Sequence, residues 1–383
     1  YRSRNGLRSI WFRLPLLHYL LFGRRAGLPH HPLFSPEFFA AQCQQHKLPL
    51  SQSPLHTYLR DRRYWTVNPH PLFDVAFYLQ QGGSMAEPPL LHYLNTGHLQ
   101  YDPHPLFRRA WYVISFPVLE QLLNHCALLH YLKDGWRGLV STHPLFDAAT
   151  YVAAAGLPLA KGVPTEDPLQ HFLQSPSTTA SCHPLFLPEY FCTQAGIDHV
   201  LPVACLLIEQ YLQQPAHWQA GTHPLFDASY YQAQLASENL PCAPLQQYIE
   251  KTCTTCNPHP LFDTGWYLGR KKDLLLLKGQ NRVPLFHFVT VGYRVGESPH
   301  PLFALQWYRH TYLQGKVNDT NPLLEFLAVG EQQGNRPNPL YPPGWRQVLV
   351  NRYGGNSLRD FAVTHPCVLP VPRNRINDVF ATG

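Results

Sequence analysis

A recurring tetrapeptide, His-Pro-Leu-Phe, constrains the fold of this chain more than any other sequence feature. A ninth, altered copy, Asn-Pro-Leu-Tyr, begins at Asn338, and the mean spacing from the first copy to the ninth is about 38 residues. Self-similarity at a period of roughly 20–50 residues is typical of proteins built from stacked structural repeats. The unaltered copies begin at His31, His70, His104, His143, His183, His223, His259 and His300.

A second sequence box recurs between the tetrapeptides and is typified by Pro-Leu-Leu-His-Tyr-Leu at residues 89–94. From the start of this box to the next tetrapeptide the chain always runs 15 or 16 residues, whereas the step from a tetrapeptide forward to the box ranges from 19 to 25. Each unit therefore has a half of fixed length and a half of variable length. Insertions in the variable half are expected at one edge of the assembled structure.

The tetrapeptide predicts the approach to a first helix, because the residue before a proline is held in an extended conformation. Aromatic residues follow seven and eight positions after the histidine in most units, as in Phe77-Tyr78. In five units the position after the tetrapeptide carries a side chain that favours the N-cap of a helix. These predicted caps are Ser35, Asp74, Asp147, Asp227 and Asp263.

The second box predicts a second, shorter helix. Proline leads most copies, which suits the first turn of a helix. Glycine stands eight residues after the box start at Gly23, Gly97, Gly135, Gly292 and Gly330, and predicts a helix that ends on a left-handed glycine. A helix of about two turns is unstable alone, so it must be held by packing. We expect the aromatic fifth residue of each box to lie in the core: Tyr19, Tyr58, Tyr93, Tyr131, Phe172, Tyr211, Tyr248, Phe288 and Phe326.

The two boxes together predict an all-α fold, an α-solenoid of about eight to nine two-helix repeats with a mean period of about 38 residues. Residues 1–30 are expected to form a partial first repeat with a basic N-terminal segment, and residues 31–345 the tandem array. Residues 346–383 are expected to form a terminal cap followed by an extended, proline-containing tail, with a helix through Gln347 to Arg352.

The composition agrees with a repeat array. A chain of 383 residues is longer than one ordinary core supports, a limit that repeats avoid because each unit packs only on its neighbours. Charged residues make up 14% and aromatic residues 13%, which is too apolar for a disordered chain. Proline is abundant at 38 residues and recurs at fixed positions of the unit, so it marks the boundaries of elements rather than low complexity.

The distribution of charge and the placement of the cysteines indicate which partners and which cellular compartment to expect. The net charge of +6 is spread over short, scattered basic clusters, whereas a nucleic-acid binder concentrates them on one face, so we expect no nucleic acid. No window approaches the ~20 apolar residues of a membrane span. Nine cysteines without a fixed place in the repeat are typical of buried thiols, which favours a reducing compartment such as the cytoplasm. The chain begins at Tyr1, and we expect it to be a portion of a longer protein.

The sequence carries no catalytic signature. It lacks a dinucleotide-binding Gly-x-Gly-x-x-Gly, a phosphate-binding loop, His-Glu-x-x-His and Gly-x-Ser-x-Gly, so we predict no catalytic residues and no cofactor. Cys253, Cys256 and His259 have a spacing that resembles a zinc site. We nevertheless predict no metal there, because His259 belongs to the tetrapeptide and its counterparts lack such cysteines.

The repeated histidines are better explained by hydrogen bonding than by metal binding. Asn338 replaces the tetrapeptide histidine in the ninth copy, and an amide can also donate and accept hydrogen bonds. The histidine of the second box, as in His92, is replaced elsewhere by Gln210, Gln247 and Glu325. We therefore predict polar partners for both kinds of histidine.

The combination of His-Pro-Leu-Phe-Asp with two aromatics and Pro-Leu-Leu-His-Tyr-Leu with a following glycine resembles tandem repeats of large bacterial proteins. These are notably cyanobacterial and proteobacterial polypeptides that also carry glycosyltransferase or other polysaccharide-modifying domains. The resemblance covers about residues 15–345. It implies helical repeats and an association with polysaccharide chemistry, and the repeats of this family have no catalytic residues to transfer.

Three classes of function are compatible with these observations, and the first two are favoured. The first is a non-enzymatic repeat scaffold that binds a protein partner or another copy of itself. The second is a carbohydrate-associated module that binds glycan directly or flanks a transferase domain, and a third is an enzyme with its site inside the array. The full length of the encoding gene would discriminate between the first two, since a downstream transferase domain would favour the second.

Overall fold

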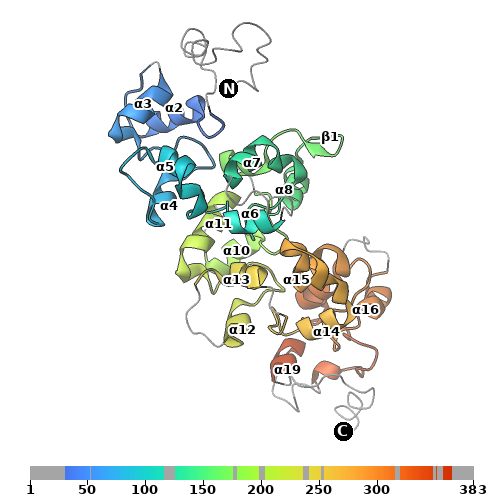
Figure 1. Cartoon of the computed structure of the whole chain (residues 1–383). Coiled ribbons are helices and arrows are strands. Elements are labelled where there is room, and N and C mark those ends of the chain that lie inside the picture. The colour runs from blue at the N-terminus through green and yellow to red at the C-terminus, as the bar shows by residue number, and fades with distance from the viewer. Residues whose placement is uncertain are drawn as a thin grey trace. The chain divides into compact units, whose positions relative to one another are not determined.

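The structure, a computed structural model, is mostly helical (Figure 1). The only sheet among the residues that it describes is one pair of two-residue strands. The all-α class predicted from the sequence is therefore confirmed, whereas the expectations for residues 1–30 and for most of 346–383 lie outside the described part of the chain. The described residues are 31–51, 53–115, 126–175, 179–197, 203–235, 241–251, 254–314, 320–347, 351 and 357–364.

The chain divides into two compact units, Tyr1–Thr178 and Thr179–Gly383. In the first unit, each helix that follows a tetrapeptide contacts the helix of the next second box. This pairing is the one that the two-box pattern predicts. The pairs are α2 (Pro36–Gln45) with α3 (Pro54–Arg60), α4 (Val75–Gln80) with α5 (Pro89–Asn95), α6 (Arg109–Ser115) with α7 (Ala127–Lys133), and α8 (Ala148–Ala155) with α9 (Pro168–Gln174).

The second unit repeats this pairing with two differences of detail. Helix α11 begins at Ala204, three residues before the predicted box start at Leu207. The α-helices α15 and α17 continue as π-helical turns, η10 (Phe288–Gly292) and η11 (Phe326–Gly330). The pairs are α10 (Pro188–Ala195) with α11 (Ala204–Gln213), α12 (Ala228–Ala233) with α13 (Pro244–Lys251), α14 (Thr264–Arg270) with α15 (Pro284–His287), and α16 (Leu305–Tyr312) with α17 (Pro322–Glu325).

The predicted N-caps are present. In each case the side-chain oxygen accepts a hydrogen bond from the backbone N–H three residues on, which satisfies a donor that the first turn leaves unpaired. Leu187 and Ala304 stand at the same position and make no such bond. The capping residues are Ser35, Asp74, Asp147, Asp227 and Asp263.

The core of each helix pair is built around three aromatic rings. One ring comes from the tetrapeptide, one from the first helix and one from the second helix, as in Phe107, Tyr112 and Tyr131. The rings of Tyr112 and Tyr131 meet edge to face at 83°, the geometry that aromatic pairs prefer. The prediction that the box aromatics are core is confirmed for the described copies: Tyr58, Tyr93, Tyr131, Phe172, Tyr211, Tyr248, Phe288 and Phe326 are all at most 1% exposed.

The predicted role of the box glycines was wrong. Gly97, Gly135, Gly292 and Gly330 are not among the residues with positive φ, so they do not end their helices in a left-handed conformation. Left-handed glycines instead close the first helix of a pair, as Gly156 does after α8. Glycine is required at these positions because there is no room for a side chain. A Cβ on each would lie 1.9–2.1 Å from the hydroxyl of a tyrosine in the first helix of the same pair.

That tyrosine hydroxyl has a repeated partner. The Tyr112 hydroxyl hydrogen-bonds to Nδ1 of His130 at 2.8 Å, and the glycine gives room for this partly buried pair. The hydroxyl of Tyr308 donates to Glu325 at 2.6 Å, so the prediction is confirmed for this substituting residue. It is not confirmed for Gln247, because neither its Oε1 nor the Tyr231 hydroxyl has a hydrogen-bond partner. The same tyrosine–histidine pair recurs at Tyr78 with His92, Tyr151 with His171, and Tyr267 with His287.

Consecutive helix pairs are joined by a recurring backbone hydrogen bond. Within each compact unit, the residue after a tetrapeptide donates its N–H to the carbonyl of the residue before the next tetrapeptide, at 2.8–3.0 Å in seven cases. Because both groups belong to the main chain, this bond does not depend on which side chain follows the box. The bonds run from Ser35 to Pro69, Asp74 to Pro103, Arg108 to Thr142, Leu187 to Thr222, Asp227 to Pro258, Asp263 to Pro299 and Ala304 to Pro337.

Hydroxyls of the core tyrosines also reach the next pair. The Tyr58 hydroxyl accepts from the N–H of Leu90 at 3.1 Å, and so caps the first turn of α5. The Tyr211 hydroxyl does the same for Leu245 in α13. Phe288 has no hydroxyl to offer, and there Asn321 caps α17 by accepting from Leu323 at 3.1 Å.

Two elements were not predicted from the sequence. A hairpin of β1 (Leu159–Ala160) and β2 (Val163–Pro164) forms in the variable half between α8 and α9. Its turn residues Lys161 and Gly162 both have positive φ, as a two-residue hairpin turn requires. Helix α19 (Leu358–Thr364) lies in the segment expected to form the cap and tail.

Candidate functional site

The tetrapeptide histidines are structural parts of a tight turn. In each turn Nδ1 of the histidine accepts a hydrogen bond from the backbone N–H two residues on, at 3.0–3.2 Å, and its carbonyl accepts from the phenylalanine N–H. Asn338 uses Oδ1 in the same way toward Leu340, which confirms the predicted polar role. The bonds run from Leu33, Leu72, Leu106, Leu145, Leu185, Leu225, Leu261 and Leu302 to the histidines of their own boxes.

Burial keeps these histidines neutral. It lowers the pKa of His104 to about 4, because a charged imidazolium would lose its hydration. The same cause lowers the pKa of His183, His223, His259 and His300 to about 3. A neutral ring with Nδ1 committed as an acceptor serves the turn and leaves that nitrogen unavailable to a metal.

The predicted weak zinc candidate is only partly described. Cys253 lies outside the described residues. Cys256 is disulfide-bonded, and Nδ1 of His259 accepts from Leu261 at 3.1 Å, so neither presents a ready ligand. The described residues hold no group of three or more His, Cys, Asp or Glu side chains placed to bind a metal. The absence of zinc at this cluster stays a prediction.

The remaining cysteines are in part as expected. Cys43, Cys126, Cys182, Cys192 and Cys205 are buried and form no disulfide, and Cys242 is half-buried and forms none either. The disulfide at Cys256 departs from the expectation of thiols throughout.

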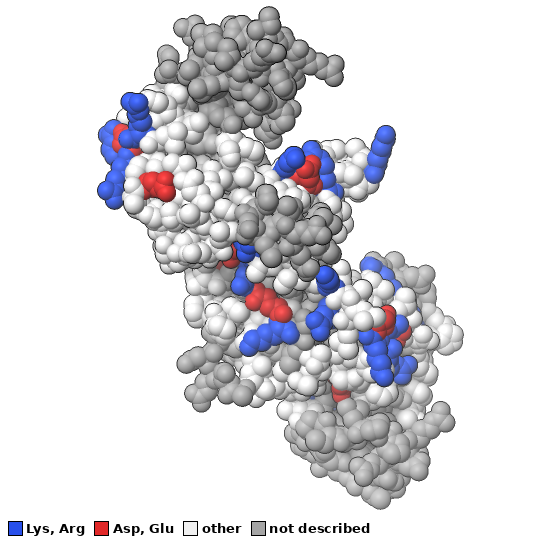
Figure 2. Space-filling view, in the orientation of Figure 1, with Lys and Arg blue, Asp and Glu red and all other residues white. Residues whose placement is uncertain are grey.

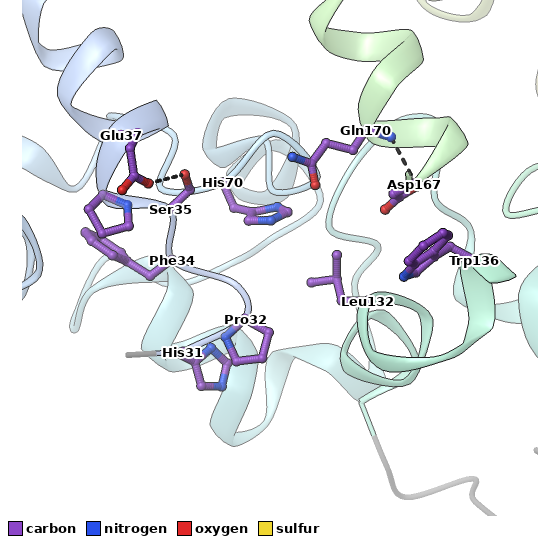
Figure 3. Close-up of a pocket in the computed structure, with 11 residues that line it drawn as sticks. His31, Pro32, Phe34, Ser35, Glu37, His70, Leu132, Trp136, Asp167 and Gln170 are labelled. Carbon is purple, nitrogen blue, oxygen red and sulfur yellow. Dashed lines mark hydrogen bonds between the residues drawn. The ribbon is translucent and has the colours of Figure 1, made fainter. Parts of the chain in front are cut away.

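One cavity in the first unit has the mixed character of a ligand site (Figure 3). Its volume is about 350 Å³, and it lies between segments that are far apart in the sequence. Figure 3 shows Glu37 and His70 on one side and Asp167 and Trp136 on the other. The lining also includes Leu132 and Gln170.

Asp167 is the most perturbed group of this cavity. Burial raises the pKa of its carboxyl to about 6. Its Oδ1 accepts from the Tyr131 hydroxyl at 2.6 Å and from the N–H groups of Leu169 and Gln170 at 3.0 and 3.3 Å. Its buried Oδ2 accepts no hydrogen bond. The carboxylate therefore caps α9 through Oδ1, and Oδ2 is available to a ligand of the cavity.

The other polar groups of the cavity are partly engaged. Glu37 accepts a long hydrogen bond of 3.4 Å from the Ser35 hydroxyl, and the Gln170 amide donates to Gln174. The guanidinium of Arg137 lies 4.3 Å from the Trp136 ring centre. Carboxylates and an amide beside an indole can bind a hydroxyl-rich ligand by accepting its hydrogen bonds and contacting its apolar face.

Sequence reasoning did not find this cavity. Trp136 follows the box glycine, and its counterpart in the preceding pair is His98, so the repeat pattern gives no signal for it. Asp167 precedes a box and could have been recognised as a cap of α9, since aspartate there suits that role. Glu37 lies in the first turn of α2, where acidic residues are common.

Charged side chains are sparse on the face shown in Figure 2. Lys and Arg lie there in small groups, several of them beside Asp or Glu, and most of the described surface is uncharged. That no nucleic acid binds remains a prediction. None of the described helices combines the length and the apolar composition that crossing a bilayer requires.

Comparison with family models, with curated proteins and with solved structures finds no match to this chain.

Proposed function

We propose that this chain is a non-enzymatic scaffold, an α-solenoid of about eight to nine two-helix repeats that binds a protein partner or a second copy of itself. The observation that carries the proposal is the use of the repeated residues. The aromatics of both boxes fill the cores, the tetrapeptide histidines close turns, and the second-box histidines pair with tyrosines. The residues that recur thus serve the architecture and leave binding to the residues that vary.

The variable halves include exposed apolar groups that a partner would cover. In the hairpin, Leu159 is 53% exposed and Val163 is 36% exposed. Stacked repeats present long faces for partners, and an array of this length exceeds the ~800 Å² per partner of a standard interface. With few charges on the surface, contact would rest on polar and apolar groups.

Excision of the hairpin tests this proposal. The N–H of Thr165 donates to the carbonyl of Pro158 at 3.1 Å, so the ends of the hairpin are already close and two glycines can replace Leu159–Pro164. We expect the excised chain to keep its far-UV dichroism and unfolding midpoint. Self-association, measured by sedimentation, should be weaker for the excised chain than for the unmodified chain. The same holds for capture of a partner when each of the two chains is used as the bait.

Two outcomes would contradict the scaffold. If self-association and capture were both unchanged, this variable half would not be part of the interface. Turnover of a nucleotide sugar by the purified chain, abolished by one carboxylate substitution, would refute the non-enzymatic reading.

The cavity of Figure 3 favours a second candidate, a carbohydrate-associated module. The resemblance of the repeats to those of polysaccharide-modifying proteins points the same way. Titration with neutral oligosaccharides, followed by isothermal calorimetry, tests it. Binding should be lost in Trp136→Ala and weakened in Asp167→Asn, which retains a capping side chain at α9, while Asp74→Asn on α4 is the matched control.

A further inference from the structure

The connection between α14 and α15 exposes three consecutive leucines. The segment 270–282, hereafter the leucine loop, contains the 3-10 turns η8 (Lys272–Leu276) and η9 (Gly279–Arg282). Leu274 points inward and is 1% exposed, whereas Leu275, Leu276 and Leu277 are 39%, 84% and 44% exposed. Isolated exposed leucines are ordinary, but a run of three forms a contiguous apolar tip that favours contact with another apolar phase.

The tip is held in place by the fold. The N–H of Leu274 donates to the carbonyl of Lys271, and that of Leu277 donates to Leu274, both at 3.1 Å. At the base of the loop the Lys271 ammonium lies 2.9 Å from the carboxylate of Glu297. The buried Leu274 and this ion pair anchor the loop, so the three leucines are presented together.

The surroundings of the tip are basic. In addition to Lys278, which makes an interaction of its own, three exposed cations, Arg270, Lys272 and Arg282, stand against one exposed acid in the segment, Asp273. The fifth cation of the segment, Lys271, is paired with Glu297. An aliphatic tip inside a basic rim matches an anionic bilayer, where the leucines reach the acyl region and the cations meet phosphate groups.

We propose that the leucine loop is a membrane-surface contact that inserts Leu275, Leu276 and Leu277 into a leaflet containing anionic lipid. The loop lies on the membrane and does not span it. This partner is of a different class from the protein partner proposed for the array, and the inference does not depend on that proposal.

Vesicle sedimentation with the full chain tests the inference. One set of vesicles is phosphatidylcholine alone, and the other is equal parts phosphatidylcholine and phosphatidylserine. We expect binding to the anionic set only, and its weakening with added salt, because salt screens the basic rim. Leu276→Ser should lower partitioning by about tenfold or more, since one leucine leaves the acyl region. Lys272→Glu with Arg282→Glu should abolish it.

The matched control is Leu206→Ser on α11, which removes a leucine that is 53% exposed and lies outside the loop. Its binding should equal that of the unmodified chain, and all variants should keep the same unfolding midpoint. Failure to bind anionic vesicles, or an equal loss in Leu206→Ser and Leu276→Ser, would overturn the inference. So would a dimer that Leu276→Ser dissociates in the absence of vesicle binding, because the loop would then contact protein.

Discussion

Gly135 and Tyr112 form a pair whose energetic coupling can be worked out from the structure. A Cβ added at Gly135 would lie 1.9 Å from the Tyr112 hydroxyl and 3.1 Å from its Cζ. The tyrosine cannot easily retreat, because it is fully buried and its ring packs on Phe107 and Tyr131 with centroids 5.4 and 5.8 Å away. Gly135→Ala must therefore displace a core ring and break its hydrogen bond to His130.

The expected cost follows from three terms. Overpacking of a core costs about 1–3 kcal/mol, and the lost hydrogen bond adds about 1 kcal/mol. Replacing glycine by alanine restricts the unfolded chain and returns about 0.4–1 kcal/mol. We expect Gly135→Ala to lower the free energy of unfolding by about 2 kcal/mol. Tyr112→Phe alone should cost about 1 kcal/mol, because it removes the hydroxyl and its bond.

The double variant is the decisive measurement. In Gly135→Ala with Tyr112→Phe the methyl group occupies the space of the missing hydroxyl, so the total cost should be about 1 kcal/mol rather than the sum of about 3 kcal/mol. Urea unfolding followed by far-UV dichroism gives the four free energies of the cycle. The control is Gly156→Ala, where φ is +66° and no atom lies within 4 Å of the new Cβ. Its cost of about 1 kcal/mol should add to that of Tyr112→Phe without coupling. Additive costs in both cycles would refute the reasoning that space for the hydroxyl is what requires glycine at position 135.

Further predictions concern the core, the turns and the cysteine cluster. Tyr131→Ala should lower the free energy of unfolding by about 3 kcal/mol or more in urea titration, as for other large core aromatics, and unchanged stability with lost glycan binding would reverse this assignment. The buried tetrapeptide histidines, with pKa values lowered to about 3–4 from 6.5, bind protons better when unfolded, so stability should fall as pH drops from about 6.5 toward 4. Each of these histidines would lower the free energy of unfolding by about 1.4 kcal/mol per pH unit in that range. A free energy of unfolding that stays constant between pH 7 and about 5 would contradict their burial. His143→Asn should remain close to the unmodified chain in melting temperature, as Asn338 makes the same bond, whereas His143→Ala should be clearly less stable. Elemental analysis should find no stoichiometric zinc, and one zinc per chain lost in Cys256→Ser would overturn that expectation.

The local part of this fold could be predicted from the sequence because its causes are local. An N-cap such as Asp74 needs only its own helix, and the prediction required no knowledge of the neighbours. The burial of Tyr93 and Tyr248 followed from a spacing that repeats with the unit. The solenoid arrangement and the number of repeats stay predictions.

The errors arose where one sequence signal has two physical causes. A glycine after a short helix indicates either a left-handed turn or a close contact, and Gly97 belongs to the second kind because of the Tyr78 hydroxyl. The cavity with Trp136 and Asp167 was missed for another reason. Its walls come from different helix pairs, and neither Trp136 nor Asp167 is repeated at the corresponding position of other units.

The backbone hydrogen bond between successive tetrapeptides bears on how the length of such a chain can change in evolution. The amide after one box and the carbonyl before the next are present whatever side chains a unit carries, and only these two groups need to meet. A gene that duplicates or loses a whole unit therefore keeps every bond of this kind, whereas a change of half a unit leaves a donor without its acceptor. Unequal recombination between repeats can thus lengthen or shorten the chain in steps of about 38 residues, and the variable halves can diverge freely after each step.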